Sequence, residues 1–217
     1  MPVKVGLRHI EKWNESLEEQ VLAYESQPAD KGQIVFYGPS YFTRWSMRFG
    51  EIPMEECIKG ASGKTCVINR GFGSSCSEHQ LYYYPRMIRP LAPKVMVYES
   101  FANGESFGYT SEELFELAQR VVWYAKTDFP NINIYLCSGH NSKNMTEKRL
   151  EETKEYSGWL MELAKNTPNV FYIDVLNHPS MKRKDIYIED GVHLNSLGYQ
   201  LYAEVFKEAL KDELVKY

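Results

Sequence analysis

The sequence predicts an α/β protein with three layers, in which a doubly wound, about five-stranded parallel sheet lies between two layers of helices. Short, nearly continuous apolar runs rich in Val, Ile, Tyr and Phe recur along the chain, as expected of strands covered on both faces. Stretches with a 3.6-residue period alternate with these runs, and this alternation favours right-handed βαβ units. The predicted strands are residues 33–37, 65–69, 94–99, 132–138 and 170–174. The predicted helices are residues 9–24, 75–89, 111–129, 146–166 and 196–214.

Two of the predicted helices begin at clear capping residues. Thr110 and Ser111 precede two glutamates, and Asn195 and Ser196 open the last helical stretch. Side chains of these types accept hydrogen bonds from the unpaired N–H groups at a helix start.

The length of the chain, 217 residues, favours one domain over two. We expect residues 1–30 to form an N-terminal helix that packs on a single domain formed by residues 31–217.

Composition and charge exclude several classes of partner. A net charge of -4 gives no electrostatic reason to expect a nucleic acid. No apolar run approaches the roughly 20 residues that a membrane span needs, and the N-terminus lacks the apolar core of a secretion signal. The four cysteines lack Cys-x-x-Cys spacing, so we expect buried free thiols in a cytoplasmic protein. We expect no metal and no cofactor, and the sequence leaves a homo-oligomer open.

A serine follows the first predicted strand, at the edge of the sheet where ligands bind in parallel α/β proteins. The segment reads Gly38-Pro39-Ser40. A serine on a tight strand-to-helix turn exposes its hydroxyl and lies near the positive end of a helix dipole. Ser40 is therefore a candidate nucleophile, and the alternative is that it only caps the helix.

A second candidate segment precedes the last helix and contains Asp190 and His193. An aspartate three residues before a histidine can accept the imidazole Nδ1–H, which leaves Nε2 free to take a proton from a serine. The alternative is a surface loop in which Asp190 caps a turn.

Four blocks of the sequence together resemble the SGNH/GDSL hydrolase family, specifically bacterial acylhydrolases with an extra N-terminal helix. The resemblance covers about residues 13–210 and implies the flavodoxin-like fold of that family. The fourth block matches the family pattern very closely and the second matches well. The first has Pro39 where the family has Asp or Ser, and the third departs from Gly-x-Asn-Asp. The blocks are residues 38–40, 69–75, 98–105 and 189–195, the last followed by Gly198 and Tyr199.

The resemblance implies an oxyanion hole with three donors, one of which is the N–H of Ser40. The family's oxyanion glycine aligns with Ser74, and Gly73 is the alternative. The family's asparagine aligns with Asn103 if one residue is inserted upstream, and with Ala102 if none is; we favour Asn103, because an asparagine after this strand end is otherwise unexplained. Asn103 followed by glycine is also a common turn.

The resemblance further implies a serine esterase or acylhydrolase that forms an acyl-enzyme on Ser40, with His193 as base and Asp190 as its partner. The expected partner is a small-molecule acyl ester, and we favour a short acyl group on a polar carrier such as an O-acetylated carbohydrate. A lysophospholipase or a platelet-activating-factor acetylhydrolase-like enzyme is the alternative. The alternative from another class is a catalytically silent relative that binds an acylated ligand.

Glu78 and His79 follow the second block. We expect them to be solvated or at the rim of the pocket, without a catalytic role.

Overall fold

The computed structural model describes residues 10–217. It contains one parallel sheet of five strands in the order β2-β1-β3-β4-β5, which confirms the predicted sheet. Because the chain moves from β1 to β2 on one side and then crosses to β3 on the other, the strand order reverses between β1 and β3. The strands are β1 (Ile34–Gly38), β2 (Val67–Gly71), β3 (Val95–Tyr98), β4 (Asn133–Cys137) and β5 (Val170–Ile173).

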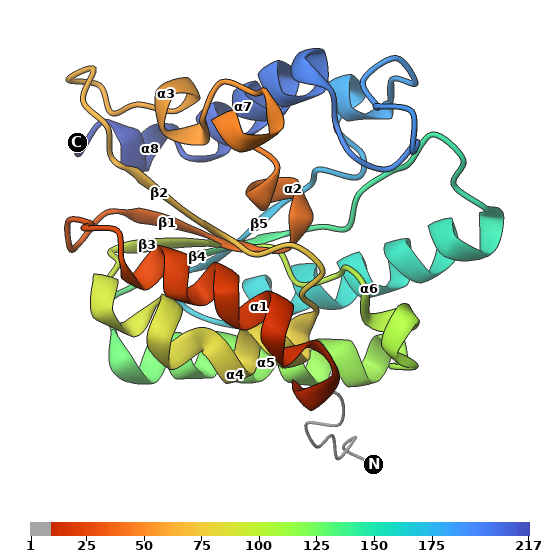
Figure 1. The fold of residues 1–217 in the computed structure, drawn as a ribbon, viewed down its shortest axis with the longest axis horizontal. Helices are drawn as coiled ribbons and strands as arrows, with labels where there is room; N and C mark the ends of the chain where they lie inside the picture. The colour runs from red at the N-terminus through yellow and green to blue at the C-terminus, as the bar shows by residue number, and fades with distance from the viewer. Residues whose placement is uncertain (1–9) are drawn as a thin grey trace.

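Helices cover both faces of the sheet (Figure 1). One layer consists of α1 (Ile10–Glu25), α4 (Ser77–Met87), α5 (Ser111–Asp128) and α6 (Glu147–Lys165). The other consists of α2 (Ser40–Thr43), α3 (Met54–Cys57), α7 (Ser196–Ala209) and α8 (Lys211–Leu214).

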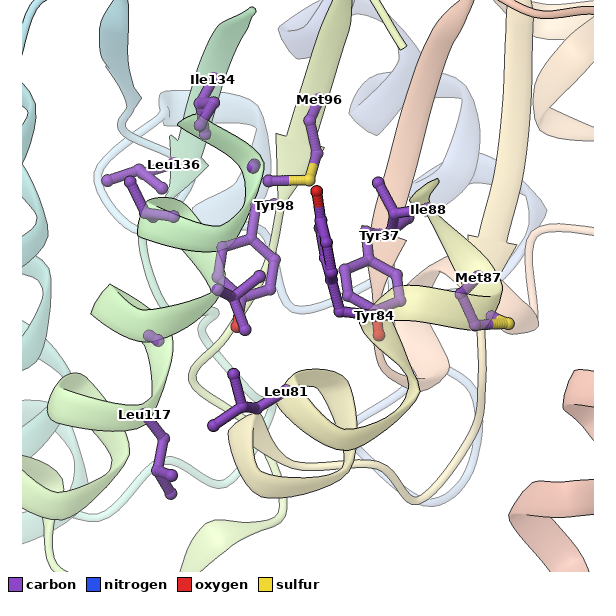
Figure 2. Close-up of a cluster of buried hydrophobic side chains, with 14 of the residues drawn as sticks. Tyr37, Leu81, Tyr84, Met87, Ile88, Met96, Tyr98, Leu117, Ile134 and Leu136 are labelled. Carbon is purple, nitrogen blue, oxygen red and sulfur yellow. The ribbon is translucent and has the colours of Figure 1, made fainter. Parts of the chain in front are cut away.

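Alternation along the strands divides the core into two clusters. In β1, Val35 and Tyr37 belong to the cluster under α4 and α5, whereas Ile34 and Phe36 belong to the cluster under α7. Successive strand side chains point to opposite faces, and all of these residues are buried, so each face needs an apolar layer of its own. Figure 2 shows the first cluster, where strand residues such as Met96 and Tyr98 pack against Leu81 and Leu117 of the helices.

The prediction of one continuous final helix over residues 196–214 is wrong. The helix divides at Leu210, which has φ -99° and ψ 8° and separates α7 from α8. The apolar pattern continues through the break because both pieces cover the same cluster, which is why periodicity alone does not reveal it.

The N-terminal helix α1 packs on the main body of the protein. Leu17 and Val21, one turn apart, are buried in the first cluster. Arg86 of α4 forms ion pairs of 2.7 Å with both Glu18 and Glu25. Residue 9, where this helix was expected to begin, lies outside the described residues, and the division of the chain at residue 30 stays a prediction.

In the described residues, no helix combines the length and the apolar character needed to cross a bilayer.

Candidate active site

The fold brings together loops from the carboxyl edge of the sheet. Ser40 lies two residues after β1, Ser74 follows β2 and Asn103 follows β3, while His193 precedes α7. The strand order reverses between β1 and β3, and a crevice at such a point is the usual ligand site in open α/β sheets.

Ser40, His193 and Asp190 form one continuous hydrogen-bonded chain. The Nε2 atom of His193 lies 2.9 Å from the Ser40 hydroxyl oxygen, and its Nδ1 atom lies 2.6 Å from Asp190 Oδ2. Asp190 Oδ1 also accepts the N–H groups of Val192 (2.8 Å) and His193 (2.9 Å). The carboxylate therefore orients both the imidazole ring and the loop that carries it.

Hydrogen bonding keeps Asp190 ionised. Burial by itself raises the pKa of this carboxyl. Hydrogen bonds from the His193 ring and from the N–H groups of Val192 and His193 outweigh burial and lower the pKa to about 2. The group can accept the Nδ1–H throughout the neutral range.

Proline is compatible with the turn before Ser40. Pro39 occupies the N-cap of α2, and its carbonyl accepts the N–H groups of Phe42 (3.2 Å) and Thr43 (3.3 Å). The N–H that proline lacks is not needed there, and Ser40 keeps its own N–H in the first helical turn, where no intrahelical acceptor exists. A side chain on Gly38 would lie 2.9 Å from the Phe42 ring and from Glu99 Cβ, so this turn requires glycine.

The loop after β2 distinguishes the two candidate backbone donors. The N–H of Gly73 donates to Gln20 Oε1 (2.7 Å), and Gln20 Nε2 donates back to the Gly73 carbonyl (3.3 Å). Ser74 adopts a left-handed conformation with φ 65°, and in the described residues its N–H donates to no protein acceptor. Because the Gly73 N–H is already used, Ser74 is the better donor candidate.

Asn103 lies beside the same loop. Its Nδ2 atom donates to the Ser75 carbonyl (2.9 Å), which occupies one of its two N–H groups. Its backbone has φ 59° and caps a short 3-10 helix, so it is a turn residue as well as a residue of the site. Of the two other residues in this block, Ala102 lines the cavity beside the site, whereas the buried Ser100 hydroxyl lies 2.8 Å from Tyr156 Oη.

Two cavities of about 540 and 550 Å³ adjoin Ser40, and Asn103 and His193 line both. The first extends between the loop after β3 and the start of α6, where Glu105, Arg149 and Glu152 line it. The second extends between α1 and the segment after α2. Its lining includes Gln20, Ser74, Arg44, Arg48 and Phe49.

Behind the serine lies a buried polar cluster that sequence reasoning missed. The Tyr41 hydroxyl donates to the Val192 carbonyl (2.9 Å), next to His193. Its ring stacks on His140 at a centroid distance of 3.8 Å. The His140 Nε2 atom lies 3.1 Å from Tyr202 Oη and 3.2 Å from the buried Glu99 carboxylate. Burial, then the charge of Glu99, raises the pKa of Tyr41 well above its usual range, so its hydroxyl remains a donor.

The expectation that Glu78 and His79 are solvated or at a pocket rim is wrong. Both are fully buried, because α4 turns its first residues toward the interior. Nδ1 of His79 accepts the N–H of Cys76 and so caps the helix. Among the described residues, Cys76, Glu78 and His79 lie close enough together to hold a metal ion. Burial raises the pKa of the Cys76 thiol to about 11. The contact between His79 Nδ1 and the Cys76 N–H gives these two residues a structural role at the start of α4.

Comparisons with known proteins agree on the fold. No family model and no curated protein matches the chain. Among solved structures, an acetyl xylan esterase aligns with TM-score 0.66 and 23% identity over 82% of this chain and 99% of its own. A GDSL-like lipase from Bacteroides thetaiotaomicron aligns with TM-score 0.66 and 15% identity over 91% and 98%. A lipase/acylhydrolase from Enterococcus faecalis aligns with TM-score 0.65 and 17% identity over 84% and 96%.

Proposed function

Because the chain has the fold of the GDSL-like lipases and acylhydrolases, we propose that it is a serine esterase that hydrolyses a small acyl ester. The observation that carries this proposal is the hydrogen-bonded chain from Ser40 through His193 to Asp190 at the carboxyl edge of the sheet. It favours an enzyme over a silent binding protein, since binding alone does not require a serine hydroxyl within hydrogen-bonding distance of a histidine that a carboxylate orients.

In the proposed mechanism, His193 Nε2 takes the hydroxyl proton of Ser40 while Oγ attacks the ester carbonyl carbon. The resulting imidazolium, stabilised by Asp190, then gives this proton to the alcohol oxygen as the carbon–oxygen bond breaks. Water then attacks the carbonyl carbon of the acyl-enzyme, with His193 again as base. The carboxylic acid is released and the hydroxyl of Ser40 is restored.

The developing oxyanion needs donors near Ser40 Oγ. We assign this role to the N–H groups of Ser40 and Ser74 and to the second N–H of the Asn103 amide. The dipole of the turn that begins at Ser40 adds to their effect. Gly73 is excluded from this set, because its N–H donates to Gln20.

The first cavity supports a polar leaving group. Besides the ion-paired side chains, it is lined by amide and hydroxyl groups, including those of Asn141, Ser142, Asn144 and Thr146. Such groups donate and accept hydrogen bonds as sugar hydroxyls require. We therefore propose a short acyl group on a polar alcohol such as an O-acetylated carbohydrate.

The test is hydrolysis of 4-nitrophenyl esters from acetate to octanoate by the wild type and by Ser40→Ala. We expect activity to fall with chain length, and Ser40→Ala to abolish turnover while far-UV circular dichroism stays unchanged. A fluorophosphonate probe should label Ser40, as mass spectrometry of the labelled peptide can establish. A Ser40→Ala variant that keeps most of the activity would exclude the proposed mechanism.

A further inference from the structure

The second cavity carries unpaired positive charge beside Ser40. Among the side chains that the structure describes, those of residues 15–217, Arg44 and Arg48 line it together with a single carboxylate, that of Glu19. With these side chains neither arginine forms an ion pair. Each lies over the ring of Phe49, at 5.1 and 5.8 Å from its centroid. The chain as a whole is acidic, with a net charge of -4. The two unpaired cations in this cavity therefore have the opposite sign to the net charge of the chain.

The charges of the first cavity, in contrast, are paired. Arg149 lies 2.7 Å from a Glu105 oxygen, and both Arg149 and Lys148 lie 3.6 Å from oxygens of Glu152. Paired charges leave little net field for a ligand, whereas unpaired guanidinium groups attract an anion. The two cavities therefore suit different parts of a substrate.

The position of the arginines links them to the reaction. Ser40 and Arg44 are four residues apart, at the first residue and the C-cap of α2, and residues with this spacing share one face of a helix. Arg48 follows in the 3-10 helix Met47–Phe49. Contact with one aromatic ring restricts both guanidinium groups, so less freedom is lost when they bind a ligand. A planar guanidinium donates two parallel hydrogen bonds to a carboxylate or a phosphate.

We propose that the ester substrate carries an anionic oxygen group, a carboxylate or a phosphate, which binds Arg44 and Arg48 while the ester carbonyl lies at Ser40. This inference rests on the proposed function and narrows it. Among O-acetylated carbohydrates, it selects those with an acidic group near the acetylated position.

The experiment compares three aryl acetates that differ in one substituent: neutral 4-acetoxybenzamide, 4-acetoxybenzoate and 4-acetoxyphenyl phosphate. A second pair, 4-nitrophenyl butyrate and mono-(4-nitrophenyl) succinate, places the negative charge on the acyl side. Each kcat/KM is divided by the rate of alkaline hydrolysis of the same ester, which removes differences in intrinsic reactivity. We expect at least one anionic ester to be preferred about tenfold or more over its neutral counterpart, as for charge-assisted hydrogen bonds.

The double variant R44Q/R48Q should lower this preference about tenfold, mainly through KM, while Lys31→Gln, which removes a positive charge outside the cavity, should not change it. The KM of the preferred anionic ester should also rise as KCl increases from about 50 to about 500 mM, because salt screens exposed charges. The double variant should lose this salt dependence. Thermal denaturation establishes that both variants are folded.

The outcomes separate the two proposals. Ser40-dependent turnover without preference for any anionic ester, or a preference that R44Q/R48Q keeps in full, overturns the inference and leaves the esterase standing. Turnover of no ester overturns both. Preference for the carboxylate ester alone or for the phosphate ester alone supports the inference and identifies the anion.

Discussion

Single residues of the site differ in how many of their hydrogen-bonding groups are already used. Asp190 uses both oxygens, one for the His193 ring and one for two backbone N–H groups. Asn103 uses one of its two amide hydrogens, for the Ser75 carbonyl. Gly73 uses its N–H. A group that already has a hydrogen-bond partner in the protein can position other groups, whereas a donor without such a partner can bind substrate. The two kinds of residue therefore need different tests.

Asp190→Asn should lower kcat. The factor of this reduction should be on the order of 10²-fold smaller than in His193→Ala, because the substitution disturbs the orientation of the imidazole without removing the base. Since the pKa of Asp190 is about 2, its carboxyl is ionised at every pH above about 4. Protonation of Asp190 should therefore contribute to no loss of activity between neutrality and pH 4. Steady-state kinetics of both variants at neutral pH give the order of the two effects, and equal kcat in Asp190→Asn and wild type would contradict the pairing.

The same lowered pKa affects stability. A carboxyl whose folded pKa is depressed stabilises the fold above its unfolded pKa, and this stabilisation disappears as pH falls through the folded value. For Asp190 the window lies between about pH 4 and pH 2. The side chain is 39% exposed, so solvent screening makes the effect small.

Asn103→Ala should lower kcat on the order of 10²–10³-fold, the usual cost of one oxyanion donor, with little change in KM. If Asn103 acts only as a turn residue, the main effect should be a lower thermal midpoint instead. Steady-state kinetics and thermal denaturation of the same variant distinguish the two roles.

At the scale of whole elements, α1 contacts the loop after β2 through the Gln20 side chain. Gln20 forms a two-point hydrogen bond with Gly73, 53 residues away, and so fixes the loop in which Ser74 holds its left-handed conformation. Such a conformation costs free energy for a residue other than glycine and persists when the surroundings enforce it. The N-terminal helix therefore holds in place the loop to which we assign an oxyanion donor.

Gln20→Ala should lower kcat about tenfold or more with little effect on KM, because small displacements of catalytic groups reduce turnover strongly. Gln20→Glu keeps an acceptor for the Gly73 N–H but loses the donor to the Gly73 carbonyl, so it should be partly active. Glu19→Gln, on the same helix and in the same cavity, is the control. Equal kcat in Gln20→Ala and wild type would remove α1 from the catalytic arrangement.

A residue of the candidate site could be predicted from the sequence only where the pattern that indicates it lies among its neighbours in the sequence. Asp190 and His193 are three residues apart, and Ser40 lies two residues after a buried strand, so local patterns indicate all three as candidates. Gln20, Tyr41 and His140 act through contacts with residues distant in sequence, and a glutamine on a helix face has no local signature. The choice between Gly73 and Ser74 likewise depends on Gln20. The five strands were predictable because a strand buried on both faces reads as a continuous apolar run.

At the scale of the whole molecule, the two edges of the sheet have separate tasks. The carboxyl edge carries the candidate site, and α8 and Tyr217 pack at the amino edge. Figure 1 shows α8 and the C-terminus at the opposite end of the sheet from α2. There the Tyr217 hydroxyl donates to the Gly32 carbonyl (2.9 Å), and Gly60 lies so close to Tyr217 that a Cβ would stand 2.6 Å from its carbonyl oxygen. We therefore expect changes in stability at this edge to leave the candidate catalytic groups in place.

Glu213 of α8 offers the sharpest test of this separation. It is only 4% exposed, and its Oε1 atom accepts hydrogen bonds from Asn133 Nδ2 (2.6 Å) and the Tyr135 hydroxyl (3.3 Å) of β4. Glu213→Ala leaves these two donors without their acceptor, which should cost about 1–3 kcal/mol. For a domain of this size, that corresponds to a fall in Tm of roughly 2–12 °C.

Glu213→Gln retains an oxygen for Asn133 and Tyr135 and loses mainly the ion pair with Lys216 (2.7 Å). That pair is exposed on the lysine side and contributes about 1 kcal/mol or less, so this variant should lie between wild type and Glu213→Ala in Tm. Calorimetry gives the order of the three proteins, and ester hydrolysis at 25 °C, well below each transition, should give equal kcat/KM for all of them. If kcat/KM falls together with Tm, the two edges are coupled through the sheet, and the division of tasks is wrong.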